Sequence, residues 1–340
     1  MKNNYTQSTW TKPDPTYELT LRPQYLADFM GQDSLKERLK IVIGASKKRK
    51  IPLGHCLFHG PPGLGKTTLA SVIANEMQSR LVVTSGPIIE KAGDLAGIMT
   101  TLEEGDILFI DEIHRLPRQI EEYLYPAMED FSLDLMLDSG PQARSVQVKL
   151  NPFTLIGATT RMGLLSSPLR SRFGFHCRLD FYTPDLLKKI ILRSTQLLGC
   201  PLSEEAAYDI GKRSRGTPRI ANNLLRWVRD FAEVHGIAPV DLMTTHQALK
   251  MLDIDEKGLD EMDKKILTTI IDHHEGGPVG VKTLAAALGE EDTTLVEVYE
   301  PYLIMLGLLR ITLRGREATK LAFEHFNRPY PFSDVKGDIL

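Results

Sequence analysis

A glycine-rich stretch at residues 60–68, GPPGLGKTT, constrains the fold of this 340-residue chain more than any other feature. It fits the pattern G-x-x-x-x-G-K-[ST] at Gly60, Gly65, Lys66 and Thr67. In such a loop the glycines let backbone N–H groups turn inward around phosphates, the lysine neutralises the β- and γ-oxygens, and the hydroxyl ligates Mg²⁺. The pattern also occurs in plain turns. Its position between the apolar segment HCLFHG and the helical segment TTLASVIANEM indicates a loop that holds a nucleoside triphosphate.

The segments around this loop alternate between strands and helices. Short apolar stretches rich in Val, Ile, Leu and Thr recur at residues 55–59, 81–86, 106–112 and 153–160, each separated by a helical stretch. This alternation predicts an α/β domain with a parallel sheet and crossover helices. Residues 133–150 interrupt it with two strand-like arms around Ser-Gly-Pro, which predicts an inserted β-hairpin.

The composition changes after residue 183. Residues 184–254 read as a small all-helical domain, and an acidic, glycine-marked linker leads into residues 255–340, where helices precede an extended pair with Arg-Gly-Arg at its tip. The polar, proline-broken residues 1–20 are expected to form a flexible segment. We therefore expect a large domain at 21–183, a helical domain at 184–254 and a C-terminal domain at 255–340.

A second motif, ILFIDEIHRL, places Asp111 and Glu112 at the end of an apolar strand. Ligands bind at the carboxyl ends of strands in sheets of this kind. Asp111 is predicted to hold Mg²⁺ and Glu112 to polarise the attacking water; an Asp-Glu pair after a strand is also a common helix cap. Next to a phosphate loop, a metal carboxylate paired with a base indicates hydrolysis.

Three further positions carry polar groups that could sense a nucleotide. Either Thr159 or Thr160 could bond the attacking water or the γ-phosphate, although both also suit strand chemistry. Arg170 or Arg172 is either a surface ion-pair former or a transition-state finger. Arg219 follows a helix start and lies at the amino end of that helix, where a cation is unfavourable, so an anion such as ATP should compensate it.

The bulk composition limits the class of protein. A net charge of −3 argues against a uniformly basic nucleic-acid coat, so any such binding must come from local patches. Cys56, Cys177 and Cys200 are far apart and indicate reduced thiols of a cytoplasmic protein. No apolar run is long enough to span a bilayer, so no membrane role is expected.

Taken together, GPPGLGKTT, ILFIDEIHRL, GATTR, PLRSRFG and RSRGTPRIANNLL resemble the AAA+ ATPases, and nearly the whole chain resembles the RuvB family among them. FIDEIHRL, LLSSPLRSRFG and FYTPDL beside GGPVG carry the narrower resemblance. The resemblance implies a P-loop AAA+ domain with an inserted hairpin, a helical lid domain and a winged-helix domain. It also implies a cytoplasmic homo-hexameric ring, an ATP- and Mg²⁺-dependent motor that pumps the duplex arms of Holliday junctions during recombination, DNA repair and the SOS response.

The resemblance also assigns roles to residues of this chain. Thr160 matches the first sensor, Arg172 the arginine finger offered to a neighbouring subunit, and Arg219 the second sensor, while Lys66, Asp111 and Glu112 are the Walker residues. Thr67 and Asp111 would hold the metal. The residues implied to contact nucleotide are Leu21, Arg22, Gly63, Gly65, Lys66, Thr67, Thr68, Glu129, Asp130, Phe131, Arg172, Tyr182, Pro218 and Arg219.

Two surfaces are implied to bind partners. The hairpin, with Val146 and Val148 on one face, would bind a RuvA-type junction-binding protein; from the residues alone, packing against the domain is equally expected. A RuvC-type resolvase is a further implied partner. Residues 281–289 and 292–307 would form a helix-turn-helix and 308–319 its wing, where Arg310, Arg314 and Arg316 give a local basic excess suited to phosphate contacts. The family often has arginine where this chain has Ile311, which favours Arg314 and Arg316 over Arg310.

Two other functions share these nucleotide residues. One is another AAA+ enzyme such as a clamp loader or replication initiator, which would differ in the hairpin and the C-terminal domain. The other is a winged-helix transcriptional regulator that uses ATP as a switch. Glu112 and Arg172 argue against the regulator, because a switch needs no rapid hydrolysis.

Overall fold

The computed structural model describes residues 20–136 and 145–331. Nearly all of the predicted N-terminal segment, the Ser-Gly-Pro tip of the hairpin and the last nine residues of the C-terminal domain lie outside the described residues. The described residues pack as two units, one made of residues 20–199 and 216–222, the other of residues 200–215 and 223–331.

The first unit contains a five-stranded parallel sheet in the order β2-β3-β6-β1-β7. Its strands are β1 (Cys56–His59), β2 (Leu81–Ser85), β3 (Ile107–Asp111), β6 (Thr154–Thr159) and β7 (Phe175–Arg178). The first four confirm the predicted strands. The fifth, β7, was not predicted, because four residues that include His and Arg at the edge of a sheet carry little apolar signal.

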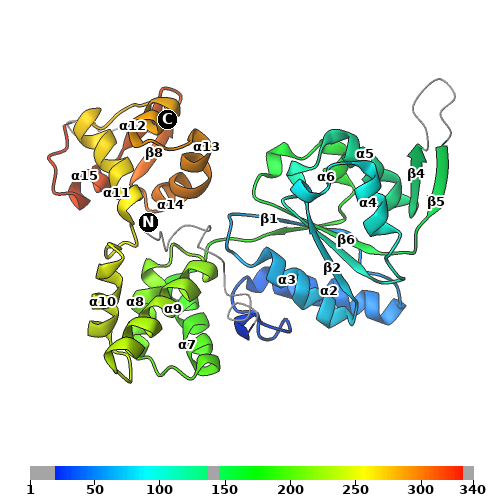
Figure 1. Cartoon of the computed structure of the whole chain (residues 1–340), viewed down its shortest axis with the longest axis horizontal. Coiled ribbons are helices and arrows are strands. Elements are labelled where there is room, and N and C mark those ends of the chain that lie inside the picture. The colour runs from blue at the N-terminus through cyan, green and yellow to red at the C-terminus, as the bar shows by residue number, and fades with distance from the viewer. Residues whose placement is uncertain (1–19, 137–144, 332–340) are drawn as a thin grey trace. The chain divides into compact units, whose positions relative to one another are not determined.

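Helices cover both faces of the sheet (Figure 1). The helices of this unit up to β7 are α2 (Asp33–Arg49), α3 (Lys66–Met77), α4 (Ala92–Met99), α5 (Arg118–Glu129) and α6 (Ser167–Ser171), with single 3₁₀ turns η1 (Gly86–Ile88), η2 (Ile113–Arg115) and η3 (Met162–Leu164). Side chains alternate along the strands: Leu108 and Ile110 of β3 join the core that α4 and α5 complete. Phe109 between them is equally buried but is not part of that core.

The predicted hairpin is present as β4 (Ser132–Met136) and β5 (Ser145–Lys149), an antiparallel pair apart from the main sheet. After β7, Thr183 caps α7 (Pro184–Leu198), where Pro184 suits the first turn because its missing N–H would have no partner there.

The second unit begins with the helices α8 (Glu204–Arg213) and α10 (Leu242–Met251), and α9 (Pro218–His235) runs on into it. The C-terminal module then adds α11 (Glu261–Thr268), η4 (Thr269–His273), α12 (Val281–Leu288), α13 (Asp292–Thr294), η5 (Leu295–Tyr299), α14 (Glu300–Met305), β8 (Leu309–Thr312), β9 (Gly315–Ala318) and α15 (Lys320–His325). The run α13-η5-α14 is helical throughout and passes through a π-helical turn just before Pro301, which has no N–H to donate.

This module confirms the predicted winged helix. Helix α12 and the run α13–α14 form the helix-turn-helix, and the antiparallel pair β8–β9 forms the wing. Its own core contains Leu267, Leu284, Leu303 and Phe323. None of the helices in residues 20–136 and 145–331 combines the length and apolarity that crossing a membrane requires.

Candidate active site

The carboxyl ends of three neighbouring strands bring the first group of predicted residues to one edge of the sheet. Strand β6 lies between β1 and β3. The glycine-rich loop follows β1, Asp111 ends β3, and Thr159 ends β6, with Ile110 paired to Gly157 and His59 to Thr159. All strands of the sheet are parallel, so these three segments leave it on the same side, where ligands bind in such folds.

The loop has a backbone conformation that suits phosphate binding. Gly65 has φ 96° and Gly60 has φ 145°, and a Cβ on Gly60 would lie 2.4 Å from the carbonyl oxygen of Leu179. Only glycine is tolerated at such positions. Helix α3 begins at Lys66 and no side chain caps its start, so its first N–H groups are available to an anion.

Lys66 is buried beneath this loop, with 7% of its surface exposed. Its Nζ donates to the carbonyl oxygens of Gly60 and Pro61, each at 2.9 Å. Burial lowers the pKa of Lys66 to about 8, opposed by the nearby carboxylates of Asp111 and Glu112. The ammonium is thus held at the loop by carbonyls that a phosphate group can replace as partners.

Glu112 has two polar neighbours that fix its carboxylate. The Oε2 atom lies 3.4 Å from the Thr160 hydroxyl and 3.4 Å from His114 Nε2. The other ring nitrogen of His114, Nδ1, is 2.9 Å from the hydroxyl of the buried Thr159. Of the two threonines left open by the sequence, Thr160 is therefore the one beside the Glu112 carboxylate, and Thr159 contacts His114.

His114 is a residue that the sequence reasoning did not select. Burial lowers its pKa, against the raising effect of Glu112, so the ring is neutral at pH 7. A neutral ring with Nε2–H toward Glu112 accepts the Thr159 hydroxyl at Nδ1. The sequence signal that could have identified His114 is its position in ILFIDEIHRL, three residues after Asp111. A short 3₁₀ turn there brings His114 back to the sheet edge.

The donor set at this edge fits a hard divalent cation. Asp111 Oδ1 accepts the backbone N–H of Glu112 at 3.0 Å. Thr67 supplies a hydroxyl from the first turn of α3. Mg²⁺ takes one or two protein oxygens and leaves its other positions to phosphates and water, which a carboxylate and a hydroxyl can satisfy. Among the described residues there is no group of three or more His, Cys, Asp or Glu that could hold a metal.

Four further residues implied to contact nucleotide, Leu21, Tyr182, Pro218 and Arg219, lie in the same unit. The backbone N–H of Arg219 donates to the carbonyl of Gly63 at 3.4 Å, which places the predicted second sensor at the phosphate loop. Tyr182 is buried, and its N–H donates to the carbonyl of Gly216 at 2.8 Å, just before Pro218. Leu21 is buried as well, and its carbonyl accepts a bond from Arg193 at 2.8 Å.

The second group of predicted residues lies at the opposite edge of the sheet. Arg172 precedes β7 by three residues, and Phe175 at the start of β7 pairs with Cys56 at the start of β1. Glu129 ends α5, and the carbonyl of the preceding Met128 bonds His55 at 2.9 Å, just ahead of β1. A four-residue strand spans roughly 13 Å. Arg172 is therefore separated from the phosphate loop of its own chain by the length of β1.

Glu129, Asp130 and Phe131 share this edge with Arg172. The Phe131 ring packs against His55 and Phe153 with centroids 6.4 and 5.9 Å apart. Arg170, the second choice for the finger, is half-buried in α6.

The two hairpin valines have different environments. Val148 pairs with the buried Leu133 and packs against the core of the first unit, whereas Val146 is 42% exposed. Only Val146 is left as an outward apolar contact. Packing against the domain thus accounts for Val148, and partner binding stays a prediction for Val146.

The three wing arginines also differ. Arg310 pairs with Glu317 at 2.6 Å across the wing, and Arg316 makes a two-pronged contact with Glu300 at 2.7 and 3.1 Å. Glu300 is 2% exposed, so Arg316 neutralises a buried carboxylate and is a weaker candidate for DNA contact than expected from the sequence. Arg314 is exposed at the wing tip, and its side chain has no polar partner among the residues that the structure describes.

Family models match three consecutive parts of the chain: "Holliday junction DNA helicase RuvB P-loop domain" at residues 21–179, "RuvB AAA lid domain" at 182–255 and "RuvB C-terminal winged helix domain" at 256–327. The "Holliday junction branch migration complex subunit RuvB" of Protochlamydia amoebophila is 63% identical over 325 residues, which cover 96% of this chain and 98% of that protein. Its counterpart in Chlorobaculum parvum is 57% identical and covers 94% of each chain.

Among solved structures, the "Thermotoga maritima RuvB Holliday junction branch migration motor" superposes with a TM-score of 0.84 at 50% sequence identity, covering 92% of this chain and all of that one. The nucleotide edge of the sheet, the lid helices and the winged helix follow one another in the order that these models require. The chain belongs to the RuvB family of P-loop ATPases.

Proposed function

We propose that this chain is the ATP-driven motor subunit of a Holliday junction branch migration complex, acting as a homo-hexameric ring that pumps duplex DNA. One observation carries the proposal: Lys66, Glu112 and Thr160 lie at the carboxyl ends of the parallel strands, whereas Arg172 lies at their amino ends. A chain with this layout completes its active site only from a neighbouring copy. A ring supplies that neighbour to every subunit.

The residues at the nucleotide edge act in sequence. Lys66 leaves the carbonyls of Gly60 and Pro61 to neutralise the β- and γ-phosphates, and the N–H groups of α3 and the loop hold the remaining oxygens. Glu112, fixed by His114 and Thr160, orients and polarises the attacking water. Arg172 from the adjacent subunit stabilises the charge of the transition state. Arg219, in the first turn of α9, contacts the phosphates, so that the position of α9 depends on whether they are bound.

We assign Mg²⁺ to the Thr67 hydroxyl and the Asp111 carboxylate. When bound, the ion would offset negative charge on the phosphates and on the leaving group.

We assign DNA binding to the winged-helix module. Arg314, exposed at the wing tip, is suited to phosphate contact without reading base sequence, as a motor that must pass through any sequence requires. The hairpin, through Val146, is the surface we assign to a RuvA-type partner. The family resemblance also supports our proposals of a hexamer, a RuvC-type resolvase as a further partner, a role in the SOS response and a cytoplasmic location. Clamp loading, replication initiation and transcriptional switching are not favoured.

The test is branch migration of a synthetic four-way junction, with and without a RuvA-type protein, using wild type, Lys66→Ala and Glu112→Gln. Wild type should separate the arms only with hydrolysable ATP. Lys66→Ala should not bind ATP, whereas Glu112→Gln should bind it and hydrolyse it poorly. ATP hydrolysis without any arm separation at junctions loaded with the partner would overturn the proposal.

A mixing experiment tests the shared site. Arg172→Ala subunits have an intact nucleotide edge, and Lys66→Ala subunits keep Arg172. Mixed rings should recover part of the hydrolysis that each variant alone lacks. Absence of recovery at every mixing ratio would show that Arg172 does not act between subunits.

A further inference from the structure

Arg215 is a buried cation at the point where the second unit joins α8 to the C-terminal module. Only 3% of its surface is exposed. Its Nη2 bonds Asp263 and lies 2.9 Å from Oδ2 of Asp260, and its Nε donates to the carbonyl of Gly258 at 3.3 Å. The guanidinium also lies over the ring of Tyr302, 5.1 Å from its centroid. One side chain thus binds the linker, α11 and α14.

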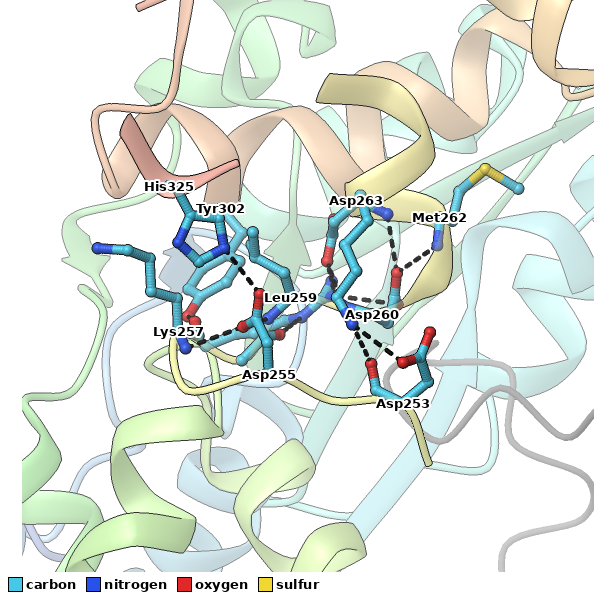
Figure 2. Close-up of polar contacts among 12 residues, drawn as sticks. Asp253, Asp255, Lys257, Leu259, Asp260, Met262, Asp263, Tyr302 and His325 are labelled. Carbon is cyan, nitrogen blue, oxygen red and sulfur yellow. Dashed lines mark hydrogen bonds and ion pairs between the residues drawn. The ribbon is translucent and has the colours of Figure 1, made fainter. Parts of the chain in front are cut away.

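The two acids that Arg215 binds also start the first helix of the winged-helix module. Asp260 caps α11 by accepting the N–H groups of Met262 and Asp263 at 2.9 Å, and Asp263 closes the capping box by accepting the N–H of Asp260 at 3.0 Å (Figure 2). A capping box fixes the direction in which a chain enters its helix. The direction of α11 is therefore tied to Arg215.

The linker before α11 is fastened at further points. The Tyr302 hydroxyl bonds the carbonyl of Lys257, and His325 Nε2 is 2.9 Å from Asp255 Oδ2 (Figure 2). Asp255 also accepts the N–H groups of Lys257 and Leu259 at 2.9 Å, which closes the turn between them. Residues 253–260 are thus bound to the module that follows them, although their acidic, glycine-marked sequence reads as a loose linker.

On the C-terminal side of Arg215 in the chain, residues 216–219 form the segment that contacts the phosphate loop. Gly216 follows Arg215, and the backbone of Arg219 bonds Gly63 of the phosphate loop. Both Arg215 (φ 52°) and Gly216 (φ 67°) have left-handed backbone conformations. A non-glycine residue is rarely held there unless its surroundings fix it, and the buried ion pairs of Arg215 provide that constraint. Only three residues separate the buried cation from the predicted second sensor.

Burying the charges of this cluster costs free energy of folding, so a gain in stability does not explain why the cluster is present. Burying charges carries a desolvation penalty that apolar side chains of similar volume avoid, so buried pairs are better explained by the geometry they specify. Burial raises the pKa of the Asp263 carboxyl, and Arg215 opposes that shift. Two carboxylates that share one guanidinium fix its position from two sides.

We propose that Arg215 is a coupling residue: it transmits the position of the Gly216–Arg219 segment, set by the bound nucleotide, to the winged-helix module through Asp260, Asp263 and Tyr302. The inference rests on the proposed motor function, in which ATP turnover at the sheet edge must move the winged-helix module. Arg215 touches no nucleotide residue itself, so it positions the module and takes no part in hydrolysis.

The test uses the full-length protein with the charges of the cluster removed together. Arg215→Met alone would leave two buried carboxylates unpaired and could unfold the module. The triple variant Arg215→Met, Asp260→Asn, Asp263→Leu keeps the volume and an N-cap at position 260 without the ions. Tyr302→Phe with His325→Gln forms a second, milder variant that keeps Arg215 and loosens only the linker. Arg328→Gln, which breaks an exposed pair with Asp272 inside the same module, is the matched control.

ATP hydrolysis without DNA and affinity for duplex DNA should stay near wild type in all variants that fold by circular dichroism. Base pairs migrated per ATP should fall roughly tenfold in the triple variant, the size of a typical coupling free energy, less in the linker variant and not at all in Arg328→Gln. If the triple variant does not fold, the linker variant decides. Migration per ATP equal to wild type in the folded variants would overturn the proposal.

Deuterium exchange separates this outcome from a failure of the motor function. In wild type, a non-hydrolysable ATP analogue should change the exchange of residues 253–263, and in the triple variant that response should be lost while the phosphate loop still responds. This readout needs no junction. If the wild-type protein migrates no junction but the ATP analogue still changes the exchange of residues 253–263, the motor proposal fails and the coupling proposal stands. If the triple variant shows the same change in exchange at residues 253–263 as wild type, the coupling proposal is rejected.

Discussion

Arg172 is paired with Glu129 of its own chain: its Nε lies 3.2 Å from Oε1, and its Nη2 donates to Oε2 at 3.2 Å. The guanidinium also donates to the carbonyl of Pro168 at 2.9 Å and lies 4.4 Å from the centroid of the Tyr125 ring. The Glu129 side chain is 55% exposed, so water screens the pair. Pairs of this kind contribute about 0–1 kcal/mol, which a neighbouring triphosphate easily exceeds. The contact orients the Arg172 guanidinium without sequestering it.

Because the Arg172–Glu129 pair is weak, substitutions of its two members should have very different effects on the rate of ATP hydrolysis. Arg172→Ala should leave ATP binding largely intact and lower the hydrolysis rate by roughly three orders of magnitude or more, as loss of a finger does. Glu129→Gln should change the rate by less than about fivefold, because it removes only a screened pair. Steady-state ATPase assays with saturating DNA measure both. A Glu129→Gln loss as large as that of Arg172→Ala would show that the carboxylate has a direct role in the reaction.

Nucleotide affinity should depend on pH above about 8. The free protein holds Lys66 with a pKa lowered to about 8, mainly by burial. A bound triphosphate favours the ammonium and raises that pKa, so binding above pH 8 takes up a proton and the affinity falls by up to tenfold per pH unit. Calorimetry in two buffers of different ionisation enthalpy detects the proton directly. ATP itself is fully ionised there, so no uptake at pH 9 would contradict a depressed Lys66 pKa in the free protein.

His114 should act through Glu112 without contacting nucleotide. His114→Ala removes a neighbour of Oε2 and should lower kcat by roughly tenfold, less than loss of the general base itself, with KM for ATP almost unchanged. Thr159→Val, which removes the hydroxyl behind the ring, should lower kcat in the same direction by less. His114→Asn should recover part of the rate. Equal losses of kcat and of nucleotide affinity would indicate general damage to the fold.

The sequence predicted the nucleotide edge well because each of its residues belongs to a local pattern. Gly60–Thr67 and Asp111–Glu112 lie within a few residues of the strand that positions them, so spacing along the chain determines their geometry. The positions of Arg172, His114 and Arg215 depend instead on pairings between distant segments, such as His55 with Met128 or Arg215 with Asp263. No local pattern encodes those pairings. The same reason explains why Arg316 was favoured for DNA: its partner Glu300 is sixteen residues away.

The two hairpin valines should give separable effects. Val146→Glu places a carboxylate on an exposed position and should weaken binding of a RuvA-type protein while leaving thermal stability unchanged. Val148→Glu places it against the core of the first unit and should lower the melting temperature, because a carboxylate there lacks a partner. Pull-down and thermal unfolding measure the two effects. Full binding by Val146→Glu would remove this face from the interface.

The wing arginines should divide into a DNA contact and a structural pair. Arg314→Ala removes an exposed cation and should weaken binding about equally on unrelated duplexes, with the slope of log affinity against log salt flatter by roughly 0.9. The melting temperature of the Arg314→Ala protein should not change.

Arg316→Ala leaves the buried Glu300 carboxylate without its partner and should destabilise the winged-helix module by about 3–5 kcal/mol, with DNA binding lost only as the module unfolds. Arg310→Ala removes a cation that is 67% exposed from its pair with Glu317; it should weaken DNA binding less than Arg314→Ala and cost little stability, because water screens the arginine. Thermal unfolding followed by binding titrations at several salt concentrations separates the three. A loss confined to one duplex sequence would favour base reading over phosphate contact, and a fully stable Arg316→Ala protein with weakened DNA binding would return Arg316 to the DNA surface.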